Sequence, residues 1–184
     1  MSTTSTALMT AEELMQLPRG YYRAELINGE LITMPVPGLP HGRIALLLGA
    51  SLLQFVSDHD LGQVYSNDAG FQLTHDPDTV LGADISFISK ERLNEVAEVR
   101  GYWQGSPDLA VEVLSPGDRP SKVNKKISRW LSFGTKQVWV ADEKHRTVTV
   151  YRSESDTTKF SGSDYLEAQD LLPGFRVSLD KIFG

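Results

Sequence analysis

The stretch at residues 108–114, DLAVEVL, decides the fold that this sequence predicts. Apolar residues fill it apart from the aspartate at its start and Glu112 in its interior. Pro107 comes directly before it, and the turn-forming residues 115–118, SPGD, come directly after it. A short apolar run bounded by such residues is typical of a buried strand. The pattern therefore predicts a central strand that carries an acid.

A helix is predicted on the carboxyl side of this strand, from about residue 119 to residue 133, with Gly134 ending it. Its apolar residues recur at spacings of three and four and form a stripe for packing on the sheet: Val123, Ile127, Trp130 and Leu131. Its basic residues share a second stripe: Lys122, Lys125, Lys126 and Arg129. Strands at 137–141 and 147–152 follow, and then a closing meander.

Upstream, the clearest signal is Asn28-Gly29, the pair that best tolerates the positive φ angles of a two-residue hairpin turn. The runs 23–27 and 30–34 flank it, so the sequence predicts an N-terminal β-hairpin. The other elements predicted before the central strand are a capped helix at 10–17, a long helix around 44–55, and strands at 63–66, 70–74 and 80–89.

The chain has 184 residues, 40% of them hydrophobic and 23% charged, which is enough for one well-buried core. We expect a disordered tail at 1–9 and a single α/β domain at 10–184, with helices flanking a central mixed β-sheet. The tail lacks the basic start and long apolar segment of a signal peptide. The absence of cysteine excludes disulfides, thiolate metal sites and cysteine nucleophiles, and it suits a cytoplasmic location.

The charge and hydropathy patterns limit the partners that we expect. No run of about 18 apolar residues occurs, so the sequence predicts no membrane span. The net charge of −6 argues against a protein that holds nucleic acid by bulk electrostatics, because phosphate binding depends mainly on Lys and Arg. A nucleic-acid function therefore requires a local basic patch or a metal.

Two acids interrupt apolar, β-rich runs: Asp84 within 80–88, and Glu112 within the central strand. A buried carboxylate is costly unless it is paired, protonated or bound to a metal. Taken alone, each acid is equally compatible with a structural ion pair or with an edge position facing solvent. Strand alternation allows both to face one cleft if their strands are neighbours.

The basic stripe of the helix at 119–133 adds weight to a shared site. Metal-assisted phosphodiester hydrolysis needs carboxylates for a hard cation and positive charge close to the phosphate. An acid-bearing strand followed by a basic helix supplies both. A helix face that only meets solvent explains the spacing of the lysines equally well.

Several motifs follow one another along nearly the whole chain. In order, they are Tyr22-x-x-Glu25-Leu26-Ile27-Asn28-Gly29-Glu30-Leu31, His41 at the start of the long helix, Ala83-Asp84-Ile85, residues 107–116 (PDLAVEVLSP), the helix containing Lys126, residues 137–142 (QVWVAD), and Leu172-Pro173-Gly174-Phe175. This series resembles the Uma-two family of restriction endonucleases, within the PD-(D/E)XK nuclease superfamily. The resemblance implies a restriction-endonuclease-like core.

By this resemblance, Asp84 corresponds to the metal-binding aspartate of the superfamily and Glu112 to the acid of its last motif. The carbonyl group of Val113 is then a further metal ligand, and Glu25 is an additional acid from the N-terminal part. The implied cofactor is Mg²⁺, with Mn²⁺ as a substitute. His41 can approach the same cleft or simply cap its loop.

The sequence departs from the superfamily pattern in two places. The pair at 82–83, Gly-Ala, replaces the proline usually found before the aspartate, and Leu114 stands where a lysine is expected two residues after the acid. That lysine orients or activates the attacking water and offsets negative charge. Lys126 matches a lysine typical of the family's following helix and is the candidate replacement, with Lys125 and Lys122 behind it.

The leading hypothesis is a Mg²⁺-dependent endonuclease that hydrolyses DNA phosphodiester bonds; a homodimer is expected by analogy, because cutting both strands needs two sites. The alternative is a domain that kept the fold, lost turnover and acts as a regulator that binds DNA or a protein. The acidic net charge and the displaced lysine suit this alternative. A glycosidase that uses two carboxylates is a third hypothesis, disfavoured by the basic helix and by the absence of an obvious sugar-stacking aromatic beside either acid.

Overall fold

The computed structural model describes residues 8–18, 22–67, 69–96 and 98–184. Most of the tail predicted at 1–9 lies outside the described residues. The helices are α1 (Ala11–Met15), α2 (Leu39–Asp58), α3 (Lys90–Asn94), α4 (Pro120–Ser132) and α5 (Leu179–Phe183). The strands are β1 (Tyr22–Ile27), β2 (Glu30–Pro35), β3 (Gly62–Ser66), β4 (Gly70–Thr74), β5 (Thr79–Gly82), β6 (Ile85–Ser89), β7 (Trp103–Gln104), β8 (Leu109–Val113), β9 (Gln137–Asp142), β10 (Thr147–Tyr151), β11 (Thr157–Ser161), β12 (Tyr165–Glu167) and β13 (Arg176–Ser178).

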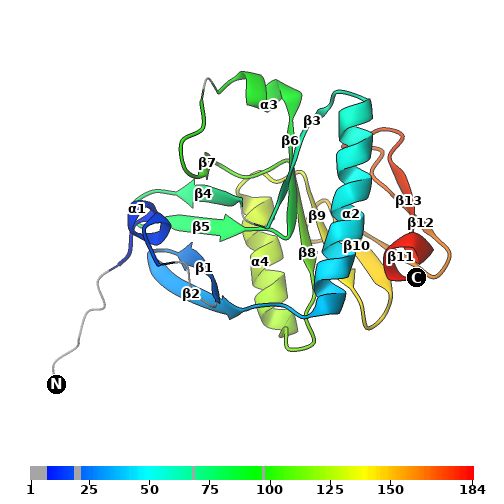
Figure 1. The fold of residues 1–184 in the computed structure, drawn as a ribbon, viewed down its shortest axis with the longest axis horizontal. Helices are drawn as coiled ribbons and strands as arrows, with labels where there is room; N and C mark the ends of the chain where they lie inside the picture. The colour runs from blue at the N-terminus through cyan, green and yellow to red at the C-terminus, as the bar shows by residue number, and fades with distance from the viewer. Residues whose placement is uncertain (1–7, 19–21, 68, 97) are drawn as a thin grey trace.

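A six-stranded mixed sheet forms the centre of the fold, with its strands in the order β11-β10-β9-β8-β6-β3 (Figure 1). Strand β8 lies between β9 and β6, so the central strand predicted at 108–114 is confirmed. Strands β8 and β9 are parallel, and α4 connects them, because a parallel pair needs a crossover rather than a tight turn. The other pairs in this sheet are antiparallel.

The two faces of this sheet bury different partners, because successive residues of β8 point in opposite directions. One set of β8 residues belongs to the core that the sheet shares with α2: Leu109, Val111 and Val113. Ala110 points the other way, into a second core with Ile127 and Trp130 of α4. Glu112 alternates in phase with Ala110 and therefore lies on the α4 side.

A second, five-stranded sheet runs in the order β2-β1-β5-β4-β7 and contributes Phe71 and Leu81 to the core on the α4 side. The chain leaves this sheet at the end of β5 and enters the central sheet at β6 through two residues, Ala83 and Asp84. The prediction of one continuous strand at 80–89 is therefore wrong. Both halves of that run are buried, so apolar content alone could not reveal the break.

The N-terminal hairpin is confirmed. Strand β1 pairs with β2 over its whole length, and Asn28 and Gly29 take the positive φ angles of 52° and 77° that the turn requires. Strand β1 also pairs with β5 where Leu26 lies opposite Val80. Helix α1 packs on this pair through its buried side, and the hairpin is thereby fixed to the strand that leads to Asp84.

Helix α2 is long and apolar enough, by length and composition alone, to cross a membrane. In the fold, it lies along the central sheet and buries one stripe in the core: Ile44, Leu48, Leu52 and Val56. The core helix of a soluble protein passes the same test, and packing accounts for this stripe. The expectation of no membrane partner stays a prediction.

The C-terminal part closes the core on the α2 side. It supplies β11 to the central sheet and forms a separate two-stranded sheet from β12 and β13. Leu166, Phe175 and Ile182 from this part belong to the core shared with α2. The closing meander predicted from the sequence is confirmed, although its strands are divided between two sheets.

Candidate active site

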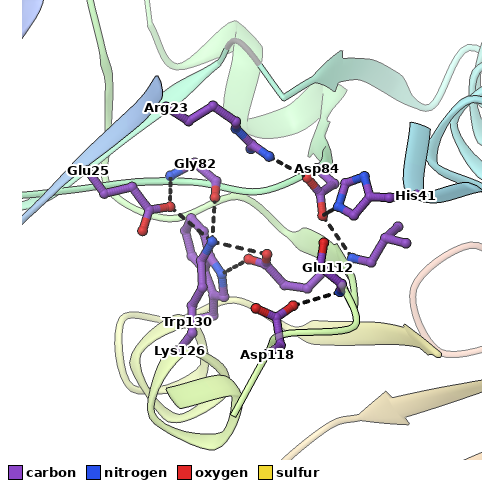
Figure 2. A network of polar contacts seen from close by, with 11 residues as sticks. Arg23, Glu25, His41, Gly82, Asp84, Glu112, Asp118, Lys126 and Trp130 are labelled. Atoms are coloured by element: carbon purple, nitrogen blue, oxygen red, sulfur yellow. Dashed lines mark hydrogen bonds and ion pairs between the residues drawn. The ribbon is translucent and has the colours of Figure 1, made fainter. Parts of the chain in front are cut away.

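Asp84 lies in the two-residue passage between the sheets, where it is 5% exposed (Figure 2). Its amide donates a hydrogen bond of 2.9 Å to the carbonyl oxygen of Val111, which fixes the passage against β8. Its Oδ2 accepts a hydrogen bond of 2.8 Å from the amide of Val113 and lies 3.2 Å from Nε2 of His41. Its Oδ1 accepts one of 2.9 Å from Nη1 of Arg23. The carboxylate therefore joins β1, α2 and β8.

The ionised form of Asp84 is stabilised in spite of its burial. Burial raises the pKa of this carboxyl group, but the hydrogen bonds from His41 and the Val113 amide act in the opposite direction. The electrostatic attraction of His41 and Arg23 adds to them, and the net result is a pKa of about 2. Asp84 is therefore a carboxylate at neutral pH, the form in which it can bind a cation.

Glu112 lies in β8 on the α4 side, with 13% of its side chain exposed. Its Oε1 accepts a hydrogen bond of 2.8 Å from the indole Nε1 of Trp130, and its Oε2 accepts one of 3.0 Å from Nζ of Lys126. Both donors lie on α4 four residues apart, which places them on one face of the helix. Helix α4 therefore orients both oxygens of this acid.

Lys126 connects the acids of the two sheets, as Figure 2 shows. Its Nζ lies 2.9 Å from Oε1 of Glu25, 3.0 Å from Oε2 of Glu112 and 2.8 Å from the carbonyl oxygen of Gly82. The amide of Gly82 donates a hydrogen bond of 3.0 Å to the same oxygen of Glu25. The two backbone groups of Gly82 therefore hold Glu25 and Lys126 together.

Burial has different outcomes for Glu112 and Lys126. Burial raises the pKa of Glu112, Lys126 and the Trp130 hydrogen bond lower it, and the neighbouring acids Asp84 and Glu25 raise it; the net result is a pKa of about 7. Burial alone lowers the pKa of Lys126, but the two glutamates outweigh it and raise the pKa above its usual value. Lys126 is therefore cationic at neutral pH, and Glu112 titrates close to neutrality.

The structure brings together the residues predicted as catalytic: Glu25, Asp84, Glu112 and Lys126. His41 reaches the site through its contact with Asp84. Val113 contributes its amide to Asp84, and its carbonyl group as a metal ligand stays a prediction. Lys122 and Lys125, predicted as accessory residues, are exposed on α4.

Two further side chains belong to this network, and no sequence motif names them: Trp130 and Arg23. The helical pattern predicts that Trp130 lies in the core stripe, where it is fully buried, and its indole also donates a hydrogen bond to Glu112. The available signal was its spacing of four residues from Lys126 on one helix. For Arg23 the available signal was its place two residues before Glu25, which puts both side chains on one face of β1.

The carboxylates of this site fit a divalent cation whose remaining ligands come from water and from the substrate. Among the residues that the structure describes, no group of three or more His, Asp or Glu side chains is gathered closely enough to hold a metal ion by itself. Mg²⁺ does not need such a cage, because one or two carboxylates hold it together with waters and substrate phosphates. Asp84 and Glu112 can supply the two carboxylates.

The layered α/β core and the acids that meet where two sheets join define a restriction-endonuclease-like fold. The chain belongs to the Uma2 family: the family model described as "Putative restriction endonuclease" matches residues 11–180. This match confirms the resemblance to the Uma-two family that the order of the motifs indicates.

A solved structure supports the fold assignment. The chain is similar to "a putative nuclease belonging to DUF820 from Anabaena variabilis ATCC 29413", with a TM-score of 0.81 and 24% sequence identity. The similarity covers 95% of this chain and 97% of that one. At this level of identity, the likeness shows a shared fold. No curated protein matches the chain.

Proposed function

We propose that this protein is a divalent-metal-dependent endonuclease that hydrolyses DNA phosphodiester bonds. One observation carries the proposal: the Nζ of Lys126 lies within 3.0 Å of both Glu25 and Glu112, in the network that also contains the passage to Asp84. A cation fixed beside carboxylates that can hold a metal is the combination that phosphodiester hydrolysis requires. Membership of the Uma2 family supports nuclease activity in general.

The side chains have separate roles in this proposal. Asp84 and Glu112 hold the cation, Mg²⁺ with Mn²⁺ as a substitute, and the Val113 carbonyl group is a further ligand. When bound, a divalent cation supplies Lewis acidity toward the phosphate and lowers the pKa of a bound water. Lys126 places positive charge where negative charge builds on the phosphate oxygens. Glu25 holds Lys126 in position from the hairpin.

The position of Lys126 also accounts for the displaced lysine. Leu114 stands where the superfamily has its lysine, and it packs against the core on the α4 side. Lys126 comes from the following helix and still reaches Glu112 at 3.0 Å. A charge delivered from α4 can therefore act in the space that a lysine at position 114 would serve.

DNA binding rests on local positive charge, because the chain as a whole carries −6. Three basic residues are exposed at the start of α4, next to the turns that bear Lys126: Arg119, Lys122 and Lys125. Phosphate groups of a strand that enters the site can contact these side chains. Lys122 and Lys125 thus act on the substrate backbone, outside the buried network.

A homodimer follows from the reaction rather than from a contact in the structure. Each chain carries one site, and cleavage of both DNA strands needs two. Light scattering of the purified protein tests this part of the proposal, with twice the chain mass as the expected result.

A specific observation favours a second function. Arg23 neutralises Asp84 and Lys126 neutralises Glu112, so the acids form a closed network without any metal. A regulatory domain that binds DNA or a protein and does not cut has use for such a network as a structural element.

Nicking of supercoiled plasmid DNA distinguishes the two functions. We expect nicking that needs Mg²⁺ or Mn²⁺, stops on addition of EDTA and is lost in Asp84→Ala and Asp84→Asn. Asp60→Asn is the matched control, because Asp60 is an exposed acid paired with Lys90 outside the site. DNA binding without nicking in either metal, unchanged by Glu112→Gln, would instead establish the regulatory domain.

A further inference from the structure

Arg23 and His41 contact different oxygens of Asp84 and differ in exposure. His41 and the Val113 amide both engage Oδ2, whereas among the described residues Arg23 is the partner of Oδ1. The side chain of His41 is 9% exposed and that of Arg23 is 26% exposed. The contacts of Oδ2 are therefore built into the core, and the contact of Oδ1 opens toward solvent.

The guanidinium group of Arg23 has capacity for a second partner. It carries five N–H donors, and within the described part of the chain it uses one nitrogen, Nη1, for Asp84. Planar guanidinium groups bind carboxylates and phosphates in the same two-pronged manner. Since Arg23 lies two residues before Glu25 in β1, its side chain stands on the face of the strand that meets the site.

Once a metal binds, the network no longer needs the positive charge of Arg23 to neutralise its acids. Without a metal, three acids (Glu25, Asp84 and Glu112) face two permanent cations, Arg23 and Lys126. A divalent cation at Asp84 adds two positive charges and repels the neighbouring guanidinium group. Lys126 is retained by three acceptors, whereas Arg23 has one and a path to solvent.

We propose that Arg23 is an exchangeable counter-ion: it neutralises Asp84 in the metal-free protein, and on metal binding it moves to a phosphate group of the DNA strand. This inference rests on the metal site in the proposed function. It makes Arg23 a competitor of the metal and a ligand of the substrate. A purely structural arginine would instead help the metal site by holding Asp84 in place.

Whether the loss of Arg23 strengthens or weakens Mn²⁺ binding tests the inference. Mn²⁺ binding is measured by electron paramagnetic resonance of the free ion, without DNA, for wild type, Arg23→Met and the control Arg43→Met. Arg43 is exposed on α2 and donates to the carbonyl oxygen of Ile182. We expect Arg23→Met to bind Mn²⁺ about tenfold more tightly than wild type, because one competing charge is lost, and Arg43→Met to bind as wild type does.

DNA binding of the same variants must change in the opposite direction. With Ca²⁺ as the metal, we expect Arg23→Met to bind a short duplex about tenfold more weakly and with a salt dependence lower by about one phosphate contact. Arg23→Gln keeps an N–H for Asp84 without the charge, so it serves if Arg23→Met does not fold. Arg23→Gln must also bind Mn²⁺ more tightly and DNA more weakly than wild type does.

The outcomes separate this inference from the proposed function. If wild type binds Mn²⁺ and both Arg23 variants bind it equally or more weakly, Arg23 is structural and the inference is overturned while the metal site stands. Unchanged DNA affinity in both Arg23 variants overturns it as well. If wild type and Arg43→Met bind no Mn²⁺ at all, the proposed metal site fails and the inference fails with it.

Discussion

Asp108, which is buried, and Glu112, which is largely buried, lie near the two ends of strand β8, and their surroundings differ in kind. Asp108 accepts a hydrogen bond of 2.8 Å from the amide of Ser89 and lies 2.9 Å from Nζ of Lys136 and 3.4 Å from Nη1 of Arg92. Burial raises the pKa of Asp108, but these partners outweigh it and hold the pKa below its usual value. Glu112 shares its lysine with another acid, and its pKa is raised to about 7.

The difference shows how an acid with a structural role differs from the acid proposed to bind the metal. The cations of Asp108 extend to the surface, where the side chain of Lys136 is 57% exposed, and they serve no second acid among the described residues. The acids around Lys126 outnumber the permanent cations, so further positive charge is favourable there. Burial of an acid in an apolar strand is common to both ends of β8, and only the balance of charges distinguishes them.

Cleavage by isosteric variants of the two acids tests this contrast with the largest expected effect. In the proposed function Glu112 holds the cation, so we expect Glu112→Gln to lower kcat/KM for DNA cleavage about 10²- to 10³-fold. Asp108→Asn should stay within about threefold of wild type per folded molecule, because Asp108 is outside the network. Equal losses in the two variants would mean that the ends of β8 do not have separate roles. Initial rates at saturating Mg²⁺ give the comparison.

The stability of the fold should depend strongly on Asp108 and only weakly on an exposed acid such as Asp60. Asp108→Ala leaves the Ser89 amide and two cations without their buried partner, so we expect the free energy of unfolding to fall by about 3 kcal/mol. Asp60→Asn removes an exposed charge and keeps a side chain that tolerates the positive φ of this position, so it should change the free energy of unfolding by less than about 0.5 kcal/mol. Urea denaturation at pH 7 measures both variants. A loss below about 1 kcal/mol for Asp108→Ala would contradict a structural role.

The pH dependence of stability should differ between the two acids. Because the pKa of folded Glu112 is raised from 4.5 to about 7, the folded protein binds this proton more tightly than the unfolded chain does. The free energy of unfolding of the metal-free protein should therefore fall, by an amount on the order of 2 kcal/mol, as pH rises from about 4.5 to about 7. Urea denaturation in EDTA at several pH values measures this fall.

Glu112→Gln should remove that fall in stability, which makes it the control. Asp108 acts in the opposite direction, because its pKa is lowered from 3.8: its contribution is present above pH 3.8 and is lost as pH falls below that value. A wild-type stability that is flat or rising between pH 5 and 7 would contradict the raised pKa of Glu112.

Trp130→Phe gives the smallest effect and the sharpest view of Glu112. The new phenylalanine keeps an aromatic ring in the core against Phe71, but the hydrogen bond to Oε1 of Glu112 is lost. We expect a cost of about 1 kcal/mol for the hydrogen bond and an upward shift in the pH at which Glu112 titrates, because the bond lowers its pKa. The midpoint of the pH–stability curve measures the shift. Trp139→Phe is the control, since its indole donates to Gln137 instead.

The sequence predicted those parts of the fold that depend on local signals. The Asn28-Gly29 turn, the apolar run before Glu112 and the two stripes of the helix at 119–133 each reflect a preference within a few residues. The passage at Ala83 and Asp84 has no such signal, because strands buried in two different sheets have the same composition as one buried strand.

The family motifs predict individual residues of the site: Glu25, Asp84, Glu112 and Lys126. The partners of these residues depend on which strands and helices meet, and for Arg23 that information lies 61 residues away in the chain. Asp108 lies in the same quoted stretch as Glu112, and only its place at the start of the apolar run and the order of the motifs set the two apart.

The passage of the chain between the sheets also has a consequence for folding. Its contacts close long loops: 61 residues separate Arg23 from Asp84, 57 separate Glu25 from Gly82, and 44 separate Gly82 from Lys126. Loop-closure entropy opposes such contacts until both sheets and α4 have docked. A partly folded chain therefore lacks the assembled carboxylates, and under the proposed function metal binding would report that folding is complete.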